Sequence, residues 1–180
     1  LSPDKTPFVI PRLCSGCRSC YFACPVRAIE EGWRTIGYTY ETMVELDGAA
    51  FTLVTVMLRE GEEHVPPAVL AGKRRALGIE ADLHLIDTSA GSSNTVSTAL
   101  YGSKLMVAVT EPTPLGLHDL EMILDIAEAL GIESWVVMNK AGIGPEEKHM
   151  EVVKERGSRL VARIPYSNEL IDSYVRGKPI

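Results

Sequence analysis

The sequence predicts a parallel α/β domain that is preceded by a small module carrying all of the cysteines. Helical patterns alternate with short apolar runs, and these runs are mostly continuous, as in strands that are buried on both faces of a parallel sheet. The runs cover 83–87, 104–110, 134–139 and 159–164. We therefore expect a cysteine module at 1–31, a β-hairpin connection at 32–62 and the α/β domain at 63–180.

The connection has the pattern of a β-hairpin. Asp47-Gly48 is a favoured two-residue turn. Apolar residues lie two or four positions apart before this turn and continue after it: Tyr38, Tyr40, Val44, Leu46, Phe51, Leu53 and Met57. The acidic residues that follow, Glu60, Glu62 and Glu63, are expected to form only a solvated loop.

Two helices are clear in the α/β domain. The first covers about 115–130, where apolar residues share one helical face and Gly131 follows as a stop. The second begins at Pro145, has two glutamates in its first turn and ends before Gly157. The four histidines are scattered without a metal-binding spacing, so we expect them to be structural.

Composition excludes several classes of protein. The 180 residues are 46% apolar and 23% charged, which favours a packed core over disorder. The net charge is −6 and no basic tract is present, so a nucleic-acid partner is not expected. No apolar run reaches the roughly eighteen residues of a membrane span, and the first residues do not resemble a secretory signal. We expect a cytoplasmic protein.

The cysteines carry the strongest motif. Cys14, Cys17, Cys20 and Cys24 have the spacing C-x2-C-x2-C-x3-C with Pro25 directly after, which is the bacterial-ferredoxin run for a 4Fe–4S cluster. Structural zinc sites usually pair two C-x2-C knuckles across a longer loop, and disulfides need an oxidising compartment. The spacing therefore predicts a ferredoxin-like α+β module. Cys24 binds either the same cluster as the other three or, as in two-cluster ferredoxins, a different one.

The loops after the predicted strands are candidate ligand sites, because ligands of open parallel sheets bind at the carboxyl ends of the strands. These loops are 87–91, 111–114, 139–140 and 165–167. Asp87 at a strand end can hold Mg²⁺, and the amide of Gly91 can face a terminal phosphate. The alternative is that Asp87 caps a helix starting near Asn94 and that Asn139 serves only a turn.

The order of these motifs resembles the MinD/ParA superfamily of P-loop ATPases, in the branch with an inserted ferredoxin domain. The cysteine run is followed by D-T-S-A-G at 87–91, T-E-P-T-P-L-G-L-H-D-L at 110–120, V-V-M-N-K at 136–140 and R-I-P-Y-S-N-E-L at 163–170. The resemblance covers nearly the whole chain. It implies a P-loop NTPase type of sheet.

The resemblance also implies cofactors, partners and site residues. ATP and Mg²⁺ would bind with Asp87 as the magnesium carboxylate of the switch region and with Gly91 at the γ-phosphate. Asn139 and the Pro165 loop would frame the adenine. The family implies a homodimer, together with a redox partner or a client protein that accepts the cluster.

The chain departs from that family most clearly in its phosphate loop. No G-x-x-x-x-G-K-[ST] phosphate loop occurs in the 180 residues, and the first residue is Leu1 rather than Met. We expect either the carboxyl-terminal part of a larger ATPase or a truncated form without hydrolysis. Two functions are therefore expected as alternatives. The first couples nucleotide state to electron transfer or cluster delivery. The second is that of a non-catalytic 4Fe–4S electron carrier or docking module.

Overall fold

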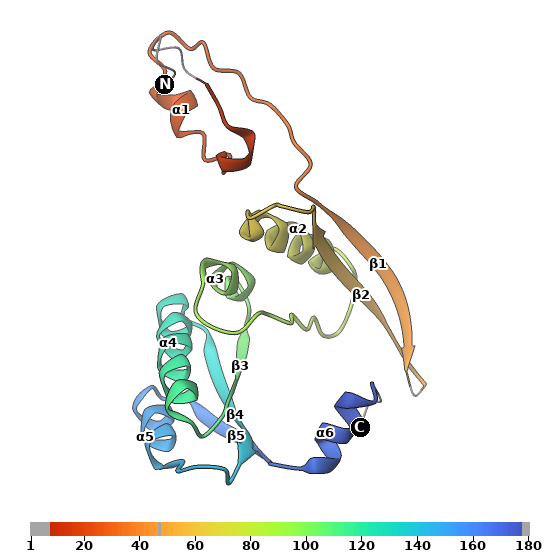
Figure 1. The fold of residues 1–180 in the computed structure, drawn as a ribbon, viewed down its shortest axis with the longest axis vertical. Helices are drawn as coiled ribbons and strands as arrows, with labels where there is room; N and C mark the ends of the chain where they lie inside the picture. The colour runs from red at the N-terminus through yellow and green to blue at the C-terminus, as the bar shows by residue number, and fades with distance from the viewer. Residues whose placement is uncertain (1–7, 47, 178–180) are drawn as a thin grey trace. The chain divides into compact units, whose positions relative to one another are not determined.

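The chain forms two compact units, Leu1–His84 and Leu85–Ile180. The computed structural model describes residues 8–46 and 48–177, and Figure 1 labels its helices and strands. The helix that follows residue 63 clusters with the hairpin in the first unit, whereas the sequence analysis placed that segment in the α/β domain. The domain bounds at 31 and 62 stay predictions.

The first unit contains the predicted hairpin. Strands β1 (Gly37–Leu46) and β2 (Ala49–Leu58) pair antiparallel, with Leu46 opposite Ala49. This register leaves two positions for the turn. Gly48 adopts the left-handed backbone with a φ of +81°, as such a turn requires, and Asp47 lies outside the described residues. The hairpin is confirmed.

Helix α2 (Val65–Leu77) covers one face of this hairpin. A Cβ atom at Gly72 would lie 2.3 Å from Cγ2 of Val56, so only glycine lets the helix approach the strand this closely. Arg75 pairs with Glu41 on the same face. Because side chains alternate along a strand, the residues at the intervening positions point away from α2.

The second unit is a mixed α/β structure around a parallel sheet. Its strands are β3 (Leu105–Thr110), β4 (Glu133–Ala141) and β5 (Arg159–Pro165), hydrogen-bonded in the order β3-β4-β5. Its helices are α3 (Asn94–Leu100), α4 (Pro114–Leu130), α5 (Glu147–Glu155) and α6 (Asn168–Val175). Three of the four predicted strands are thus confirmed, with the parallel pairing that the continuous apolar runs indicated.

Helix α4 forms the centre of the core. The Thr113 side chain accepts the N–H of Gly116 at 3.0 Å and caps the helix, and Gly131 ends it with a φ of +66°. Leu120 and Leu124 are fully buried, where they pack with apolar residues of α3, β3 and β4. In 8–46 and 48–177, neither this longest helix nor any other combines the length and the apolar character that a membrane span requires.

Residues 83–87 do not form the predicted strand. In the described part of the chain they pair with no other strand, and Leu83 and Leu85 are 78% and 89% exposed. An apolar run becomes a strand only where a neighbouring strand accepts its backbone hydrogen bonds. The prediction of a fourth strand is therefore wrong for this structure, and Asp87 does not stand at a strand end.

Helix α5 begins at Glu147 rather than at Pro145. The Glu146 carboxylate accepts the N–H of Gly142 at 3.1 Å and lies 3.2 Å from Nη2 of Arg163. These contacts hold Glu146 in the preceding loop. His149 of the same helix is buried, as expected of a structural residue.

Candidate functional sites

The cysteine loop is shaped by two reversals of the backbone. Gly16 and Arg18 have φ values of +71° and +61°, and they lie on either side of Cys17. Cys14 follows the short helix η1 (Pro11–Leu13), and Cys20 lies in α1 (Ser19–Ala23). A left-handed conformation is uncommon for an arginine, so its presence here marks a loop whose shape is imposed by more than local preference.

The four thiols are free and accessible. Cys14, Cys17 and Cys20 are exposed, and Cys24 is half-buried. Within 8–46 and 48–177, no three histidine, cysteine or acidic side chains converge as a ligand set. The structure therefore presents the predicted ligands on one short loop without drawing them together.

Two of the four cysteine sulfur atoms take part in hydrogen bonds. The N–H of Ala28 donates to Sγ of Cys24 at 3.2 Å, and Sγ of Cys17 lies 3.4 Å from Oγ of Ser19. Contacts with Ser19, followed by the Ser15 side chain, lower the pKa of the Cys17 thiol to about 7. The thiolate is the form that binds metals, and hydrogen bonds to sulfur are one way in which proteins tune iron–sulfur clusters. Four thiols on one short loop, two of them hydrogen-bonded, fit a 4Fe–4S cluster.

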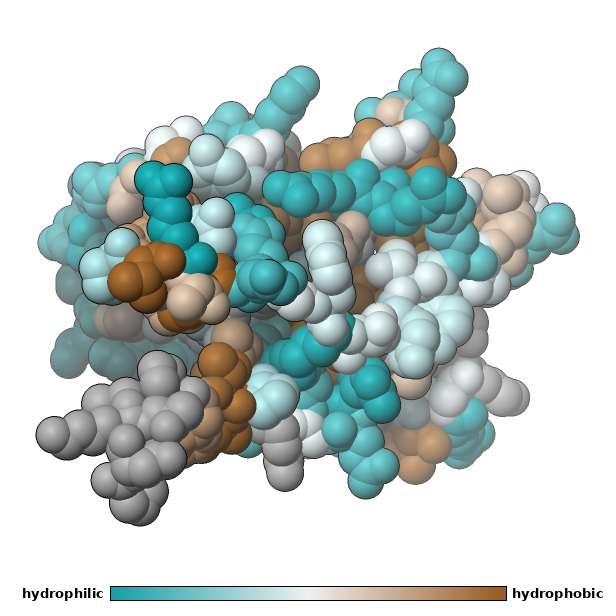
Figure 2. All heavy atoms as spheres, turned by 90° about the horizontal axis from the view of Figure 1, so that it is seen from above, coloured by the Kyte–Doolittle hydropathy of each residue, from teal (hydrophilic) through white to brown (hydrophobic). Residues whose placement is uncertain are grey.

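The described residues of the cysteine module form no apolar core of their own. Among the described side chains of residues 8–31, only Cys24 and Ile29 are even half-buried. Large apolar residues around the loop, Phe8, Leu13, Phe22 and Val26, are exposed. Figure 2 shows hydrophobic side chains, drawn in brown, standing at the surface. A segment of this size usually needs a metal or disulfides for stability.

A second group of residues lies at the carboxyl edge of the parallel sheet. Nζ of Lys140, just after β4 leaves its pairing with β3, lies 2.7 Å from Oε1 of Glu111, which follows β3. Asn139 is half-buried beside Lys140, and Pro165 at the end of β5 pairs with Ala141. The structure therefore brings together the three segments that the sequence placed on this edge, although 139–140 belongs to β4 and is not a loop after it.

Asp87 and Gly91 are not joined to this edge. Asp87 is exposed, and in the described ranges no hydrogen bond or ion pair connects it to Glu111, Asn139 or Lys140. Gly91 has a φ of +90° with open space around it. The predicted site residues thus fall into two groups, and the roles of all of them stay predictions.

Residues 7–30 match the family model for the 4Fe-4S binding domain. The match supports 4Fe–4S binding. It covers most of the cysteine module and all four cysteines, in agreement with the ferredoxin-type interpretation of their spacing. We call residues 8–31 the 4Fe–4S module below.

Three proteins of Methanocaldococcus jannaschii are similar to this chain over longer ranges. The uncharacterized protein MJ0579 is 28% identical over 97% of the chain and 58% of its own length. The uncharacterized ATP-binding proteins MJ0823 and MJ0685 are 31% and 27% identical, over 67% and 53% of the chain and 49% and 39% of their own lengths. The chain therefore spans about half the length of the curated relatives it matches.

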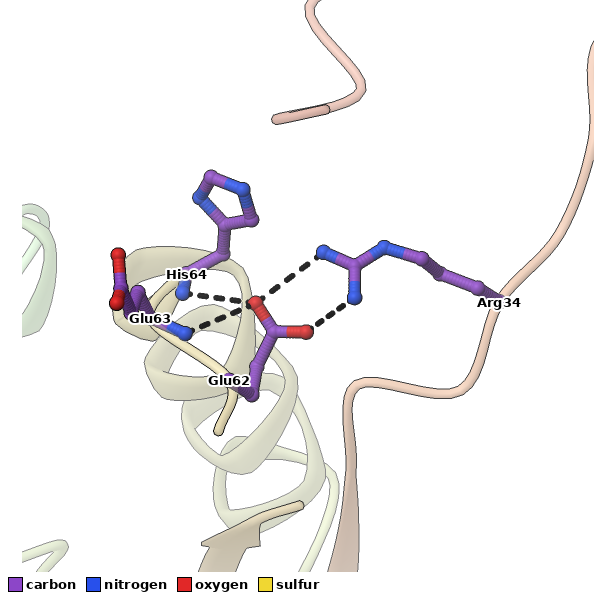
Figure 3. A network of polar contacts seen from close by, with 4 residues as sticks. All are labelled: Arg34, Glu62, Glu63 and His64. Carbon is purple, nitrogen blue, oxygen red and sulfur yellow. Dashed lines mark hydrogen bonds and ion pairs between the residues drawn. The ribbon is translucent and has the colours of Figure 1, made fainter. Parts of the chain in front are cut away.

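Sequence reasoning missed one polar network of the first unit, drawn in Figure 3. Glu62, expected to be solvated, has a side chain only 4% exposed and forms a bidentate ion pair with Arg34. Its carboxylate also accepts the backbone N–H groups of Glu63 and His64, directly before α2, at 3.1 and 2.9 Å. The expectation for Glu62 was wrong because its partner lies far away in the sequence. The ion pair ties the segment after the 4Fe–4S module to the start of α2.

Replacing Glu62 with glutamine is expected to detach the segment that contains Arg34 from the start of α2. The Arg34 guanidinium, followed by the N–H of His64, lowers the pKa of the Glu62 carboxyl from its ordinary 4.5 to about 2. Stability from a carboxyl with a depressed pKa is present above pH 4.5 and is lost as the pH falls toward 2. At pH 7 the variant should show faster amide hydrogen exchange at residues 34–36 and 63–64, by about tenfold.

The matched control is Glu60→Gln, which changes an exposed carboxylate in the same loop and should leave this exchange unaltered. In the unmodified protein, ¹³C NMR should place the titration of the Glu62 carboxyl well below pH 4. A midpoint above pH 4, or equal exchange in both variants, would contradict the anchoring role of Glu62.

Proposed function

We propose that this chain couples ATP binding to the state of a 4Fe–4S cluster, as part of a P-loop ATPase of the MinD/ParA type. The output is gated electron transfer or delivery of a cluster to a client protein. The observation that carries the proposal is the carboxyl edge of the sheet, where Glu111 follows β3, Asn139 and Lys140 lie in the last residues of β4, and Pro165 ends β5. Ligands of such sheets bind at this edge.

The chemistry of the edge suits a nucleotide. The Asn139 amide offers both a donor and an acceptor, which is what recognition of a base requires. The Glu111–Lys140 ion pair fixes two of the loops relative to each other, so it would position Asn139 rather than touch the base itself. The names of two relatives, which describe those proteins as ATP-binding, add support.

Asp87 and Gly91 would serve the phosphate end of the ligand. A carboxylate holds Mg²⁺, and an amide in an open glycine turn can face a phosphate oxygen. Both residues are exposed and lie in the segment before α3. Mg-ATP would pull this segment toward the sheet edge. Such a movement would transmit the binding of nucleotide to the rest of the chain.

Cys14, Cys17, Cys20 and Cys24 would hold the cluster, which supplies one-electron chemistry when bound. Because the thiols are exposed at the surface of the 4Fe–4S module, a redox partner or client protein would be able to approach the cluster closely. The N–H of Ala28 would stabilise negative charge on the sulfur of Cys24, and the Ser19 hydroxyl, which accepts from the Cys17 thiol in this structure, would donate to that sulfur once it is a thiolate.

The test is calorimetric titration of Mg-ATP into the cluster-loaded chain. Asp87→Ala is expected to weaken binding by about tenfold or more, because one carboxylate ligand of the metal is lost. Asp82→Ala, which removes an exposed carboxylate from the same segment, should bind like the unmodified chain. The midpoint potential of the cluster, measured with and without Mg-ATP, should shift if the two sites are coupled.

A plain 4Fe–4S electron carrier or docking module is the second candidate. It is favoured by the exposed position of Asp87 and by the lack of a phosphate-loop motif in the 180 residues. This function predicts no heat of binding at millimolar Mg-ATP and a potential that does not respond to nucleotide. That result would overturn the coupling proposal and leave the cluster intact.

A further inference from the structure

Arg18 occupies a backbone position that favours glycine. It lies directly after Cys17, is exposed, and has a φ of +61°. The left-handed conformation costs stability for any residue that carries a Cβ, and glycine avoids this cost. A long charged side chain at such a position is therefore expected to offset the cost through contacts of its own.

The Arg18 side chain makes two contacts with one carboxylate. Nε of Arg18 lies 3.1 Å from Oε1 of Glu31, and Nη2 of Arg18 donates to Oε2 at 3.2 Å. Paired contacts of this kind fix the orientation of the two groups as well as their separation. Among the described side chains of 8–31, this is the only ion pair.

The ion pair closes a loop that contains two of the four cysteines. Cys20 and Cys24 both lie between Arg18 and Glu31 in the sequence. Helix α1 begins directly after Arg18, and the N–H of Ala28 donates to Sγ of Cys24 before the chain reaches Glu31. Because hardly any side chain of this loop is buried, a contact that joins its two ends restricts its conformations more than packing does.

We propose that the Arg18–Glu31 ion pair positions Cys20 and Cys24 as ligands of the 4Fe–4S cluster and slows the loss of iron from it. The proposal rests on the cluster binding in the proposed function and is independent of ATP binding. A loop whose ends are already joined loses less conformational entropy when its thiolates bind a metal. Arg18 and Glu31 are positioning residues, since they act through the cysteines between them.

Arg27 provides an internal comparison. It is also an exposed arginine of the 4Fe–4S module with a left-handed backbone, at a φ of +51°. In the part of the chain that the structure describes, its side chain has no ion-pair or hydrogen-bond partner. Glycine at position 18 or at position 27 removes one positive charge and relieves the same backbone cost. Only the change at position 18 takes the partner away from Glu31.

The first experiment measures the release of iron from the cluster-loaded chain into an excess of ferrozine, under argon and without nucleotide. The paired side chains are 59% and 45% exposed, so the expected effect is moderate. Arg18→Gly and Glu31→Gln should each release iron about threefold to tenfold faster. The double variant should be no faster than either single one, because all three lose the same contact. Arg27→Gly should release iron no faster than the unmodified chain.

The midpoint potential of the cluster separates positioning by this ion pair from a general loosening of the module. In the unmodified chain the charges of Arg18 and Glu31 largely cancel. Arg18→Gly leaves the carboxylate unbalanced and should lower the potential, because negative charge disfavours the reduced cluster. Glu31→Gln leaves the guanidinium unbalanced and should raise the potential. A loosened module would shift both potentials in the same direction.

A third measurement uses the unmodified chain and does not depend on the folding of variants. Iron release should become faster as NaCl is raised from about 0.05 M to about 1 M, since salt screens an exposed ion pair. Release that ignores salt, additive effects in the double variant, shifts of potential in one direction, or equal acceleration by Arg27→Gly would each overturn the proposal and leave cluster binding intact. An unmodified chain that takes up no iron and sulfide would instead overturn cluster binding itself, and this proposal with it.

Discussion

Replacing Cys20 with serine is expected to abolish the 4Fe–4S absorption and to unfold residues 8–31. This segment contains one turn of η1 and the five residues of α1, and hardly any of its described side chains are buried. Its stability must therefore come from metal ligation, because binding of a metal that fixes a loop is itself folding free energy. Amide exchange across 8–31 should accelerate at least about tenfold.

The control for this prediction is Glu30→Gln, which changes an exposed residue of the module and spares the thiols. It should keep both the absorption and the exchange pattern. The strands of the second unit, β3 to β5, should stay protected in either variant because they belong to a separate compact unit. If the amides of 8–31 stay protected from hydrogen exchange after loss of the cluster, buried side chains stabilise the module and the prediction is wrong.

Replacing Gly116 with alanine is expected to destabilise the second unit by about 2–3 kcal/mol. A Cβ at this position would lie 2.3 Å from the carbonyl oxygen of Glu111 and 3.2 Å from its backbone nitrogen. Backbone atoms cannot move aside as a flexible side chain can. Thr110 also donates from Oγ1 to the Gly116 carbonyl at 2.8 Å, so a shift at this turn breaks a further hydrogen bond.

Urea denaturation followed by far-UV circular dichroism measures this loss. Leu115→Ala is the neighbouring control, since Leu115 is exposed in the first turn of α4 and its removal should change the free energy of unfolding by less than about 0.5 kcal/mol. Equal stability of the two variants would mean that the turn between β3 and α4 adapts. Because Glu111 begins this turn, Gly116→Ala should also weaken the binding of any ligand at the sheet edge.

Much of the fold could be predicted because its signals are local. The turn residue Gly48, the helix cap Thr113 and the stop Gly131 act within a few positions of themselves, and they define the hairpin and α4. The meeting of Glu111 and Lys140 also follows from a general rule, since parallel strands end at one edge of a sheet. The particular ion pair could have been anticipated from the charged residues directly after β3 and near the end of β4.

The features that sequence reasoning missed depend on distant partners. Residues 83–87 have the composition of a strand, but pairing requires a neighbour that composition does not specify. Glu62 resembles any surface glutamate until Arg34 approaches it. The spacing of the cysteines predicts their ligand chemistry, whereas their convergence depends on a group that is not part of the polypeptide.

The order of the elements has a consequence for how the chain folds. Strands β1 and β2 are neighbours along the chain and need only a two-residue turn to meet, so the hairpin can form within microseconds. Each pair of strands in the parallel sheet is joined through an entire helix, which makes closure slower. During synthesis the hairpin and α2 therefore emerge and fold while the sheet is incomplete. Once Leu77 has left the ribosome, the nascent chain already displays the exposed apolar residues of the hairpin, which makes this stage the most prone to aggregation between nascent chains.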